Sequence, residues 1–229
     1  MSQKVKKEIP RERLLEEAEA LFAEKGYTAV SVREIIAAAD CNVASINYYF
    51  GNKKNLYLEV FRSRWIPRAR RVHEYFRKLL GDQDPTSLTA VVKSLALAFL
   101  EGPLTDEERR RHHQLMAREM AQPTEAFALV AEEITGPFFE KLASLLRPFM
   151  PPELTREQVM LNILCIFAMV LYFNFARVAV SRLTGQEYDE TFKARLVDHL
   201  IGFSLTGLGT NLPEEMKLSS GPHLAHTPT

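Results

Sequence analysis

Residues 31–50 read Ser31-Val-Arg-Glu-Ile-Ile-Ala-Ala-Ala-Asp-Cys-Asn-Val-Ala-Ser-Ile-Asn-Tyr-Tyr-Phe50, and this stretch predicts two short helices with a tight turn between them. Ser31 and Glu34 form a capping box, because each side chain can accept a hydrogen bond from the backbone N–H of the other at a helix start. Apolar residues at helical spacing then mark the buried face of the first helix: Val32, Ile35, Ile36 and Ala39. The first helix should therefore begin directly after Ser31.

The second helix of the pair should run from Val43 to Phe50, after the turn Asp40-Cys-Asn42. We expect Val43, Ile46 and Phe50 to face inward, because this spacing places them on one side of a helix. Two short helices joined by about four residues have the dimensions of a helix-turn-helix, whose second helix enters the major groove of DNA. Helical hairpins of this size also occur in proteins that never contact DNA, so the spacing alone leaves both interpretations open.

The outward side of the second helix favours DNA binding. It carries small or hydrogen-bonding residues, without the Glu and Lys that coat a merely solvated helix: Ala44, Ser45, Asn47 and Tyr48. Small side chains let a helix approach base edges, Asn can pair with adenine, and hydroxyls can bond to bases or phosphates. Lys53 and Lys54 follow in the first turn of the next helix, where the helix dipole disfavours cations but a phosphate would bind well. The alternative is that these lysines are simply exposed.

Longer helices flank this pair on both sides. The preceding one should run from about Pro10 to Lys25 and end at Gly26. The following one should begin at its N-cap Asn52 and reach Leu80, and Pro67 can kink it.

The segment Gly26-Tyr-Thr-Ala-Val-Ser-Val-Arg-Glu-Ile-Ile-Ala-Ala-Ala-Asp40, followed by Ser45-Ile-Asn-Tyr-Tyr-Phe-Gly-Asn-Lys53, resembles the N-terminal domain of TetR-family regulators. The resemblance spans about Arg11 to Phe61. It implies a three-helix DNA-binding domain, a dimer on a palindromic operator, and a ligand-controlled second domain. The DNA-facing positions that it implies are Ser31, Arg33, Val43, Ala44, Ser45, Asn47, Tyr48, Tyr49 and Lys53. Many members have Tyr at the position of Asn47 and His at that of Tyr49, so the operator of a relative cannot be transferred to this chain.

A second resemblance covers Arg118-Glu-Met-Ala-Gln-Pro-Thr-Glu-Ala-Phe127 and continues through Pro137 and Leu142. This segment is similar to the C-terminal domain of the CecR-type subgroup. The similarity implies a broad, mostly hydrophobic effector pocket, and it does not name the effector.

The whole chain reads as an all-α protein, because apolar residues recur at helical spacing and no segment alternates as a strand would. Further helices are expected at 88–100, 106–121, 125–147, 156–183 and 188–208, and Gly136-Pro137 can kink or divide the third of these. The expected organisation is a helix-turn-helix domain at 1–55, an effector-binding and dimerisation domain at 56–210, and a Pro/Ser/Gly-rich tail at 211–229 that is expected to be disordered.

Charge is divided unevenly along the chain. Residues 1–78 carry sixteen Lys and Arg against ten Asp and Glu, a net charge of +6, while the remainder has a net charge of −6. The first third is therefore the part suited to nucleic acid, although basic faces are often only solvated surface. Cys41 and Cys165 lie far apart and match no metal-ligand spacing, which fits a reducing compartment, and we expect a cytoplasmic protein. The apolar run 163–173 is shorter than the ~20 residues of a membrane span, so a buried helix and no membrane association are expected.

The last two helices are apolar over more than one face, which predicts a two-fold, four-helix dimer interface rather than burial within one chain. The middle helices should line a pocket for a small hydrophobic effector. The expected lining residues are Phe99, Met116, Met120, Phe127, Phe138, Phe139, Leu142, Asn174 and Arg177. Any single Phe or Met in this set is more often plain core.

An enzyme is the main alternative, and the sequence lacks the motifs it would need. There is no Gly-rich phosphate loop, no Gly-X-Ser-X-Gly turn and no HExxH motif. His112 and His113 point about 100° apart on a helix, so they do not form a metal site. Cys41 has no nearby Cys partner for a redox switch. We therefore expect no cofactor, no metal and no catalytic residues, but a ligand-responsive regulator of transcription that acts as a repressor.

Overall fold

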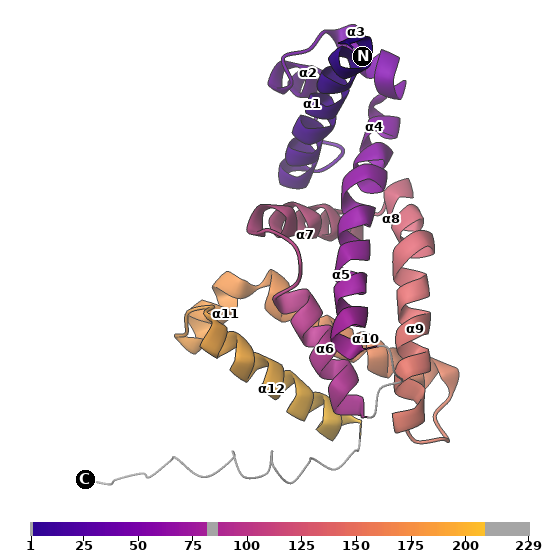
Figure 1. Ribbon diagram of the computed structural model, residues 1–229, viewed down its shortest axis with the longest axis vertical. Helices are drawn as coiled ribbons and strands as arrows, with labels where there is room; N and C mark the ends of the chain where they lie inside the picture. The colour runs from indigo at the N-terminus through magenta and orange to yellow at the C-terminus, as the bar shows by residue number, and fades with distance from the viewer. Residues whose placement is uncertain (1, 82–86, 209–229) are drawn as a thin grey trace, which may run out of the picture. The chain divides into compact units, whose positions relative to one another are not determined.

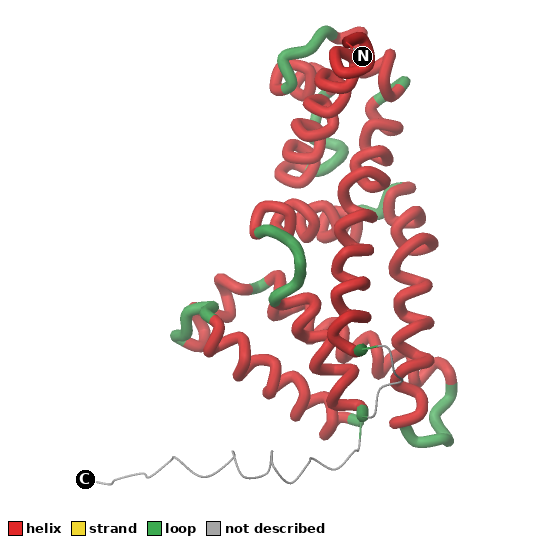
Figure 2. Tube along the Cα trace, viewed as in Figure 1, coloured by secondary structure: helices red, strands yellow, loops and turns green. Residues whose placement is uncertain are grey.

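A computed structural model describes residues 2–81 and 87–208, with side chains from residue 11 onward, and the expected tail at 211–229 lies outside the described residues. Regular structure in the described residues is entirely helical (Figure 2). The elements in chain order are α1 (Ser2–Lys25), α2 (Val32–Ala38), α3 (Val43–Phe50), α4 (Lys53–Val60), the π-helical turn η1 (Phe61–Trp65), α5 (Ile66–Leu80), α6 (Leu88–Leu100), α7 (Asp106–Ala121), α8 (Glu125–Val130), the π-helical turn η2 (Ala131–Thr135), α9 (Gly136–Leu146), the 3₁₀ turn η3 (Arg147–Phe149), α10 (Arg156–Phe175), α11 (Arg177–Thr184) and α12 (Glu190–Gly207) (Figure 1). The predicted all-α class is confirmed.

Side-chain caps fix several helix starts where the sequence predicts them. Complete capping boxes begin α2 at Ser31, α7 at Thr105 and α10 at Thr155. The Asn52 side chain accepts from the backbone N–H of Asn55 at 2.8 Å and begins α4. Each cap satisfies a backbone donor that the first turn of a helix leaves without a partner, so these starts follow from local chemistry.

Some predicted boundaries are wrong. The first helix begins at Ser2 rather than near Pro10, because the Lys- and Glu-containing segment before the proline forms helix readily and the helix continues through the proline. The helix predicted at 156–183 is divided at Ala176, whose backbone leaves the helical region at φ −94° and ψ 26°. The last helix begins at Glu190 rather than at residue 188, because Asp189 caps it by accepting from Phe192 N at 2.7 Å.

Both π-helical turns precede a proline at the same spacing. Turn η1 ends two residues before Pro67, and η2 ends two residues before Pro137. A proline removes a backbone donor and its ring collides with the carbonyl four residues earlier, and a π turn is a known way for a helix to accommodate such a break. The expected perturbations at Pro67 and Gly136-Pro137 therefore take the form of π turns, and the helix continues on either side.

The helices form two compact units. The first contains residues up to Glu74 together with Pro103–Phe138, and the second contains Tyr75–Gly102 together with residues from Phe139 onward. The first unit has one core, to which α1 contributes Leu14, Ala18 and Phe22 and to which α7 contributes Leu115. This unit extends beyond the domain predicted at 1–55, because α7 and α8 pack against α1 and α4. In the second unit, α6 packs against both α10 and α12.

Helix α10 is the one described helix that is long and apolar enough to cross a membrane, judged by length and composition alone. Only 28% of its most apolar window is buried. Within the single chain, the helix predicted to be buried at 163–173 is therefore only partly buried, where α10 packs against α6 and α12. Large apolar side chains that remain exposed on α10 are Leu161, Leu164, Tyr172 and Phe175.

Candidate DNA-binding site

Helix α3 is held by the core of the first unit. Its inner side chains Ile46 and Phe50 are buried, and they belong to the same apolar cluster as Ile35 of α2 and Leu56 of α4. Helix α3 packs against α1, α2 and α4 (Figure 1). With one side fixed in this way, the other side of α3 is presented to solvent.

The turn before α3 is closed by short-range hydrogen bonds. Asp40 takes the left-handed conformation at φ 48°, and the Cys41 N–H donates to the Ile36 carbonyl at 3.0 Å. Asn42 then caps α3 by accepting from Ala44 N at 3.0 Å. Because Asp and Asn tolerate these turn conformations, the predicted turn needs no glycine.

The outward face of α3 contains the predicted reading residues. Tyr48 is 65% exposed, and Ala44 and Asn47 are exposed, while Ser45 and Tyr49 are half-buried. Tyr49 packs edge to face with Tyr48, with ring centroids 4.9 Å apart. The prediction that Val43 faces inward is wrong, because Val43 is 57% exposed. Val43 is the first residue of α3, and the buried contacts of the helix begin only at Ile46.

Helix α2 places two further predicted residues at its start. Arg33 is exposed, whereas Ser31 is engaged in the capping box with Glu34 at 2.7 Å and 3.2 Å. The hydrogen bond from the Ser31 backbone N–H, with further hydrogen bonds from the Ser31 hydroxyl and from Lys25, lowers the pKa of Glu34 to about 2. The ionised carboxylate keeps the start of α2 fixed beside the predicted DNA-facing surface.

Lys53 lies in the first turn of α4. Its ammonium nitrogen is 4.4 Å from the centre of the Tyr27 ring, an attractive contact between a cation and an aromatic face. Partial burial lowers the pKa of Lys53, and the charge of Glu34 opposes this effect. The contact with the Tyr27 ring therefore restricts the orientation of the Lys53 side chain.

Sequence reasoning missed a polar network behind this surface. The Tyr57 hydroxyl donates to the buried carboxylate of Glu119 at 2.6 Å, and Arg118 donates to the Glu24 carbonyl at the end of α1. In the sequence, Tyr57 lies near the end of the segment that resembles the TetR-family N-terminal domain. Arg118 and Glu119 begin the separate segment that resembles the CecR-type C-terminal domain. No pattern along the chain indicates that they meet.

The residues predicted to line an effector pocket are divided between the two units. Met116, Met120, Phe127 and Phe138 lie in the first unit, and Phe99, Phe139, Leu142, Asn174 and Arg177 lie in the second. Met120 is 62% exposed and Phe127 is 38% exposed, whereas Leu142 is fully buried.

Within the second unit, the predicted effector-binding residues form two small groups of contacts. Phe99 and Phe139 each pack edge to face on Phe167, at 5.1 Å and 5.0 Å between ring centroids. Arg177 donates to the Asn174 side-chain oxygen at 3.2 Å and to a carbonyl at the end of α6. Within the described residues, no group of three or more His, Cys, Asp or Glu side chains is placed to hold a metal ion.

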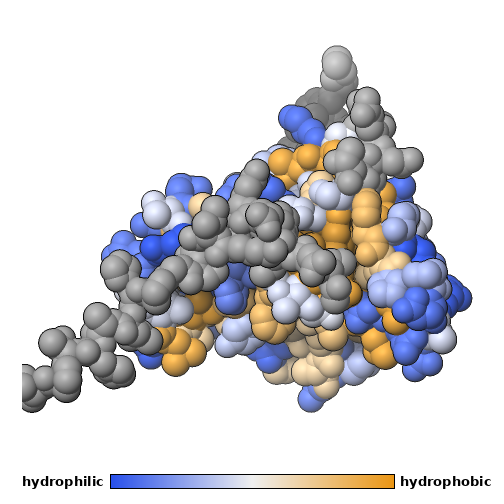
Figure 3. Space-filling model, turned by 90° about the horizontal axis from the view of Figure 1, so that it is seen from below, coloured by the Kyte–Doolittle hydropathy of each residue, from blue (hydrophilic) through white to orange (hydrophobic). Residues whose placement is uncertain are grey.

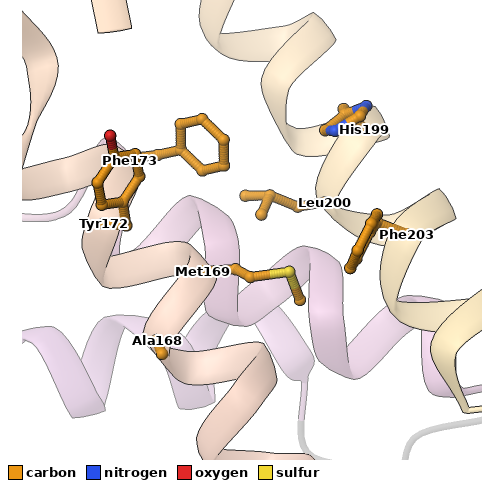
Figure 4. Close-up of a pocket in the computed structure, with 7 residues that line it drawn as sticks. All are labelled: Ala168, Met169, Tyr172, Phe173, His199, Leu200 and Phe203. Carbon is orange, nitrogen blue, oxygen red and sulfur yellow. The ribbon is translucent and has the colours of Figure 1, made fainter. Parts of the chain in front are cut away.

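A groove of about 440 Å³ runs between α10 and α12 in the second unit. Its lining is Ala168, Met169, Tyr172 and Phe173 from α10, and His199, Leu200 and Phe203 from α12 (Figure 4). The side chains of the two helices face each other across it, and His199 is the one ionisable group besides the Tyr172 phenol. None of these residues is in the predicted effector set. Hydrophobic side chains also gather in surface patches in the space-filling view (Figure 3).

Comparisons with known proteins agree with this architecture. Residues 14–60 match the family model of bacterial regulatory proteins of the TetR family. Residues 85–208, more than half of the chain, match the C-terminal domain of the HTH-type transcriptional dual regulator CecR. The HTH-type transcriptional dual regulator CecR of Shigella flexneri is 27% identical over 205 residues, covering 86% of this chain and 90% of that protein. The probable HTH-type transcriptional regulator YttP of Bacillus subtilis is 48% identical over 46 residues, covering 20% of this chain and 22% of that protein.

Solved structures show the same fold. A transcriptional regulator from Rhodococcus sp. RHA1 has a TM-score of 0.59 at 17% identity, covering 88% of this chain and 98% of that chain. The SmeT–triclosan complex has a TM-score of 0.58 at 17% identity, covering 95% of this chain and 99% of that chain. Both family resemblances seen in the sequence are confirmed, and the relatives are regulators of transcription rather than enzymes. The chain is a member of the TetR family of bacterial transcriptional regulators, with a C-terminal domain of the CecR type.

Proposed function

We propose that this regulator acts as a repressor, binding a palindromic DNA operator as a homodimer and leaving it when a small hydrophobic effector binds. The observation that most supports sequence-specific DNA binding is the outward face of α3. Asn47 and Tyr48 are exposed on a helix whose opposite side is fixed in a core. Such a helix can enter a major groove, where side-chain hydrogen bonds to base edges distinguish sequences.

The remaining DNA contacts in this proposal are distributed around α3. Arg33 at the start of α2 and Lys53 at the start of α4 supply cations for phosphates, which position the protein without reading sequence. Val43, Ala44, Ser45 and Tyr49 complete the proposed surface on α3, and Ser31 completes it on α2. The exposure of Val43 fits contact with a thymine methyl group, a role that an inward position would not allow.

Selection of bound duplexes from a random library tests operator recognition. We expect one enriched sequence with two-fold symmetry, because a two-fold dimer reads two half-sites in opposite orientations. An Asn47→Ala variant in the same selection should lose enrichment at the bases that Asn47 reads. Enrichment of no sequence, or of an asymmetric single site, would contradict the proposal.

The proposed dimer uses the exposed side of α10 and α12. Leu161, Leu164, Ala168 and Tyr172 recur at three- and four-residue intervals along α10, and Phe203 on α12 is 60% exposed. An apolar stripe of this length on one chain marks an interface, and a second copy forming a four-helix bundle would cover it. Light scattering should return about twice the 26.1 kDa chain mass. A monomer mass at micromolar concentration would remove both the dimer and the two-half-site operator.

The effector is proposed to be small and hydrophobic, bound by the predicted residues of the second unit and their neighbours. Half-buried Phe99, Phe139 and Phe167 offer apolar surface, and Asn174 and Arg177 of the same unit offer polar groups. Leu142 of the second unit remains part of this proposal, whereas Met116, Met120, Phe127 and Phe138 lie in the first unit and stay predictions from the sequence. The structural neighbour SmeT is a complex with triclosan, which makes triclosan a suitable first probe.

The proposed signal runs along the helical path from Lys53 to Leu80, which begins at the DNA-facing surface and ends among residues of the second unit. An effector can shift DNA affinity only if it binds the two states with different affinities. Calorimetry should detect triclosan binding that Phe139→Ala weakens, and saturating triclosan should lower operator affinity. If triclosan or another bound hydrophobic probe occupies the site defined by Phe139→Ala and operator affinity does not change, the release mechanism is wrong.

A further inference from the structure

Glu119 of α7 is a carboxylate buried among neutral donors. It is 1% exposed, and it accepts from the Tyr57 hydroxyl at 2.6 Å, from the Thr124 N–H at 2.9 Å and from the Thr124 hydroxyl at 3.0 Å. In the described part of the chain, the hydrogen bonds to this carboxylate come from neutral groups alone, the Tyr57 hydroxyl and the N–H and hydroxyl of Thr124. A buried carboxylate held by neutral donors is costly and depends on its hydrogen bonds, so its geometry is tightly constrained.

Tyr57 connects this carboxylate to the DNA-facing surface. The Tyr57 ring packs on the Tyr27 ring with centroids 4.9 Å apart, and it also packs edge to face with the Phe22 ring, with centroids 4.8 Å apart. Tyr27 in turn carries the ammonium of Lys53 over its ring at 4.4 Å. Lys53 and Tyr57 are four residues apart in α4 and therefore lie on the same side of that helix.

Helix α7 also fixes the chain on the other side of Tyr27. It lies across the C-terminal end of α1 in Figure 1, where Arg118 donates to the Glu24 carbonyl at 2.5 Å. Gly26 follows at φ +83°, and a Cβ added to it would lie 3.4 Å from the Arg118 side chain. The segment that leads into Tyr27 is therefore held between the end of α1 and α7.

We propose that Glu119 and Tyr57 are positioning residues for DNA binding, which aim the Lys53 ammonium at a backbone phosphate through the Tyr27 ring. The proposal rests on the proposed phosphate contact of Lys53. It assigns a role to the adjacent residues Arg118 and Glu119. The arginine holds the end of α1, and the glutamate holds Tyr57 of α4. Together these contacts keep the Tyr27 ring in position under Lys53.

The test compares Lys53→Ala, Tyr57→Phe, Glu119→Gln and the double variant Tyr57→Phe with Lys53→Ala. Binding to a scrambled duplex is measured at several salt concentrations, because the slope of log K against log salt counts phosphate contacts. Lys53→Ala should reduce the slope by about one ion per subunit. Tyr57→Phe and Glu119→Gln should reduce it in the same direction and weaken binding roughly 3- to 10-fold. The double variant should bind no more weakly than Lys53→Ala alone.

Tyr188→Phe is the matched control. It removes another tyrosine hydroxyl that donates to a partner, the Phe173 carbonyl, but in the second unit. This control should lower the melting temperature to a similar extent as Tyr57→Phe and leave the salt slope unchanged.

The outcomes separate the two proposals. If Lys53→Ala reduces the slope while Tyr57→Phe and Glu119→Gln change only the melting temperature, the positioning role is wrong and the phosphate contact of Lys53 stands. If Lys53→Ala leaves the slope unchanged, the proposed contact fails and the positioning role fails with it. Should Glu119→Gln not fold, Tyr57→Phe decides the question, because it removes one oxygen atom and keeps the ring packing.

Discussion

The imidazole of His73 stacks face to face on the ring of Phe138, with centroids 3.9 Å apart and an angle of 6° between the planes. Burial lowers the pKa of His73 to about 4, and burial also lowers the pKa of His112 well below its ordinary value. Folding therefore favours the neutral imidazoles. Because the pKa in the folded state lies below the value of about 6.5 in the unfolded state, this stabilisation is complete above about pH 6.5 and is lost as the pH falls toward 4.

His73→Phe should flatten this pH dependence. The free energy of unfolding of the wild type should fall by roughly 1–3 kcal/mol more than that of the variant between neutral pH and about pH 4.5. Denaturant titrations at several pH values measure the difference. Parallel curves for the wild type and His73→Phe would show that His73 is not the titrating group.

Asn47→Ala should separate sequence reading from affinity. We expect a loss of about 1–3 kcal/mol on the selected operator and a much smaller loss on a scrambled duplex, because Asn47 lies on the outward face of α3 where base edges are read. Titrations on both duplexes provide the comparison. An equal loss on both, accompanied by a smaller salt slope, would mean that Asn47 contacts phosphate and that the reading face has been assigned incorrectly.

Leu164→Glu should convert the proposed dimer to a monomer. Leu164 is 42% exposed on α10, and burying a carboxylate at an apolar interface costs several kcal/mol. Light scattering and operator binding should change together. Met120→Glu is the control, since Met120 is 62% exposed on α7, outside the proposed interface. A dimer mass for Leu164→Glu would place the interface elsewhere.

Gly136→Ala should destabilise the protein, although the same change in an ordinary helix stabilises it by up to about 1 kcal/mol. A Cβ at this position would lie 2.9 Å from the Ala131 carbonyl oxygen, which accepts the π-type hydrogen bond from the Gly136 N–H. We expect a loss of about 1–3 kcal/mol by denaturant titration. The control is Gly207→Ala at the end of α12, where nothing lies within 4 Å and the effect should be neutral or favourable. A stabilised Gly136→Ala would mean that the turn relaxes without cost.

The sequence by itself determined the elements whose causes are local. Helix α3 has the predicted bounds, because Asn42 starts it and Gly51 ends it. The capping boxes at Ser31, Thr105 and Thr155 fix three further starts, since each needs only residues three apart. The outward position of Asn47 and Tyr48 also follows from helical spacing once Ile46 and Phe50 are known to be apolar. Family membership came from the same local pattern.

Only the tertiary structure decided the features that depend on distant segments. Val43 has the apolarity of a core residue, but the buried contacts of α3 begin only at Ile46, so Val43 is exposed. The break at Ala176 occurs without glycine or proline, beside the bond from Arg177 to the Leu100 carbonyl 77 residues earlier. Tyr57 and Glu119 are separated by 62 residues, and they meet because α4 and α7 both pack against α1. The spacing of apolar residues in the sequence indicates which face of a helix is apolar. Which other helix covers that face depends on how the whole chain packs.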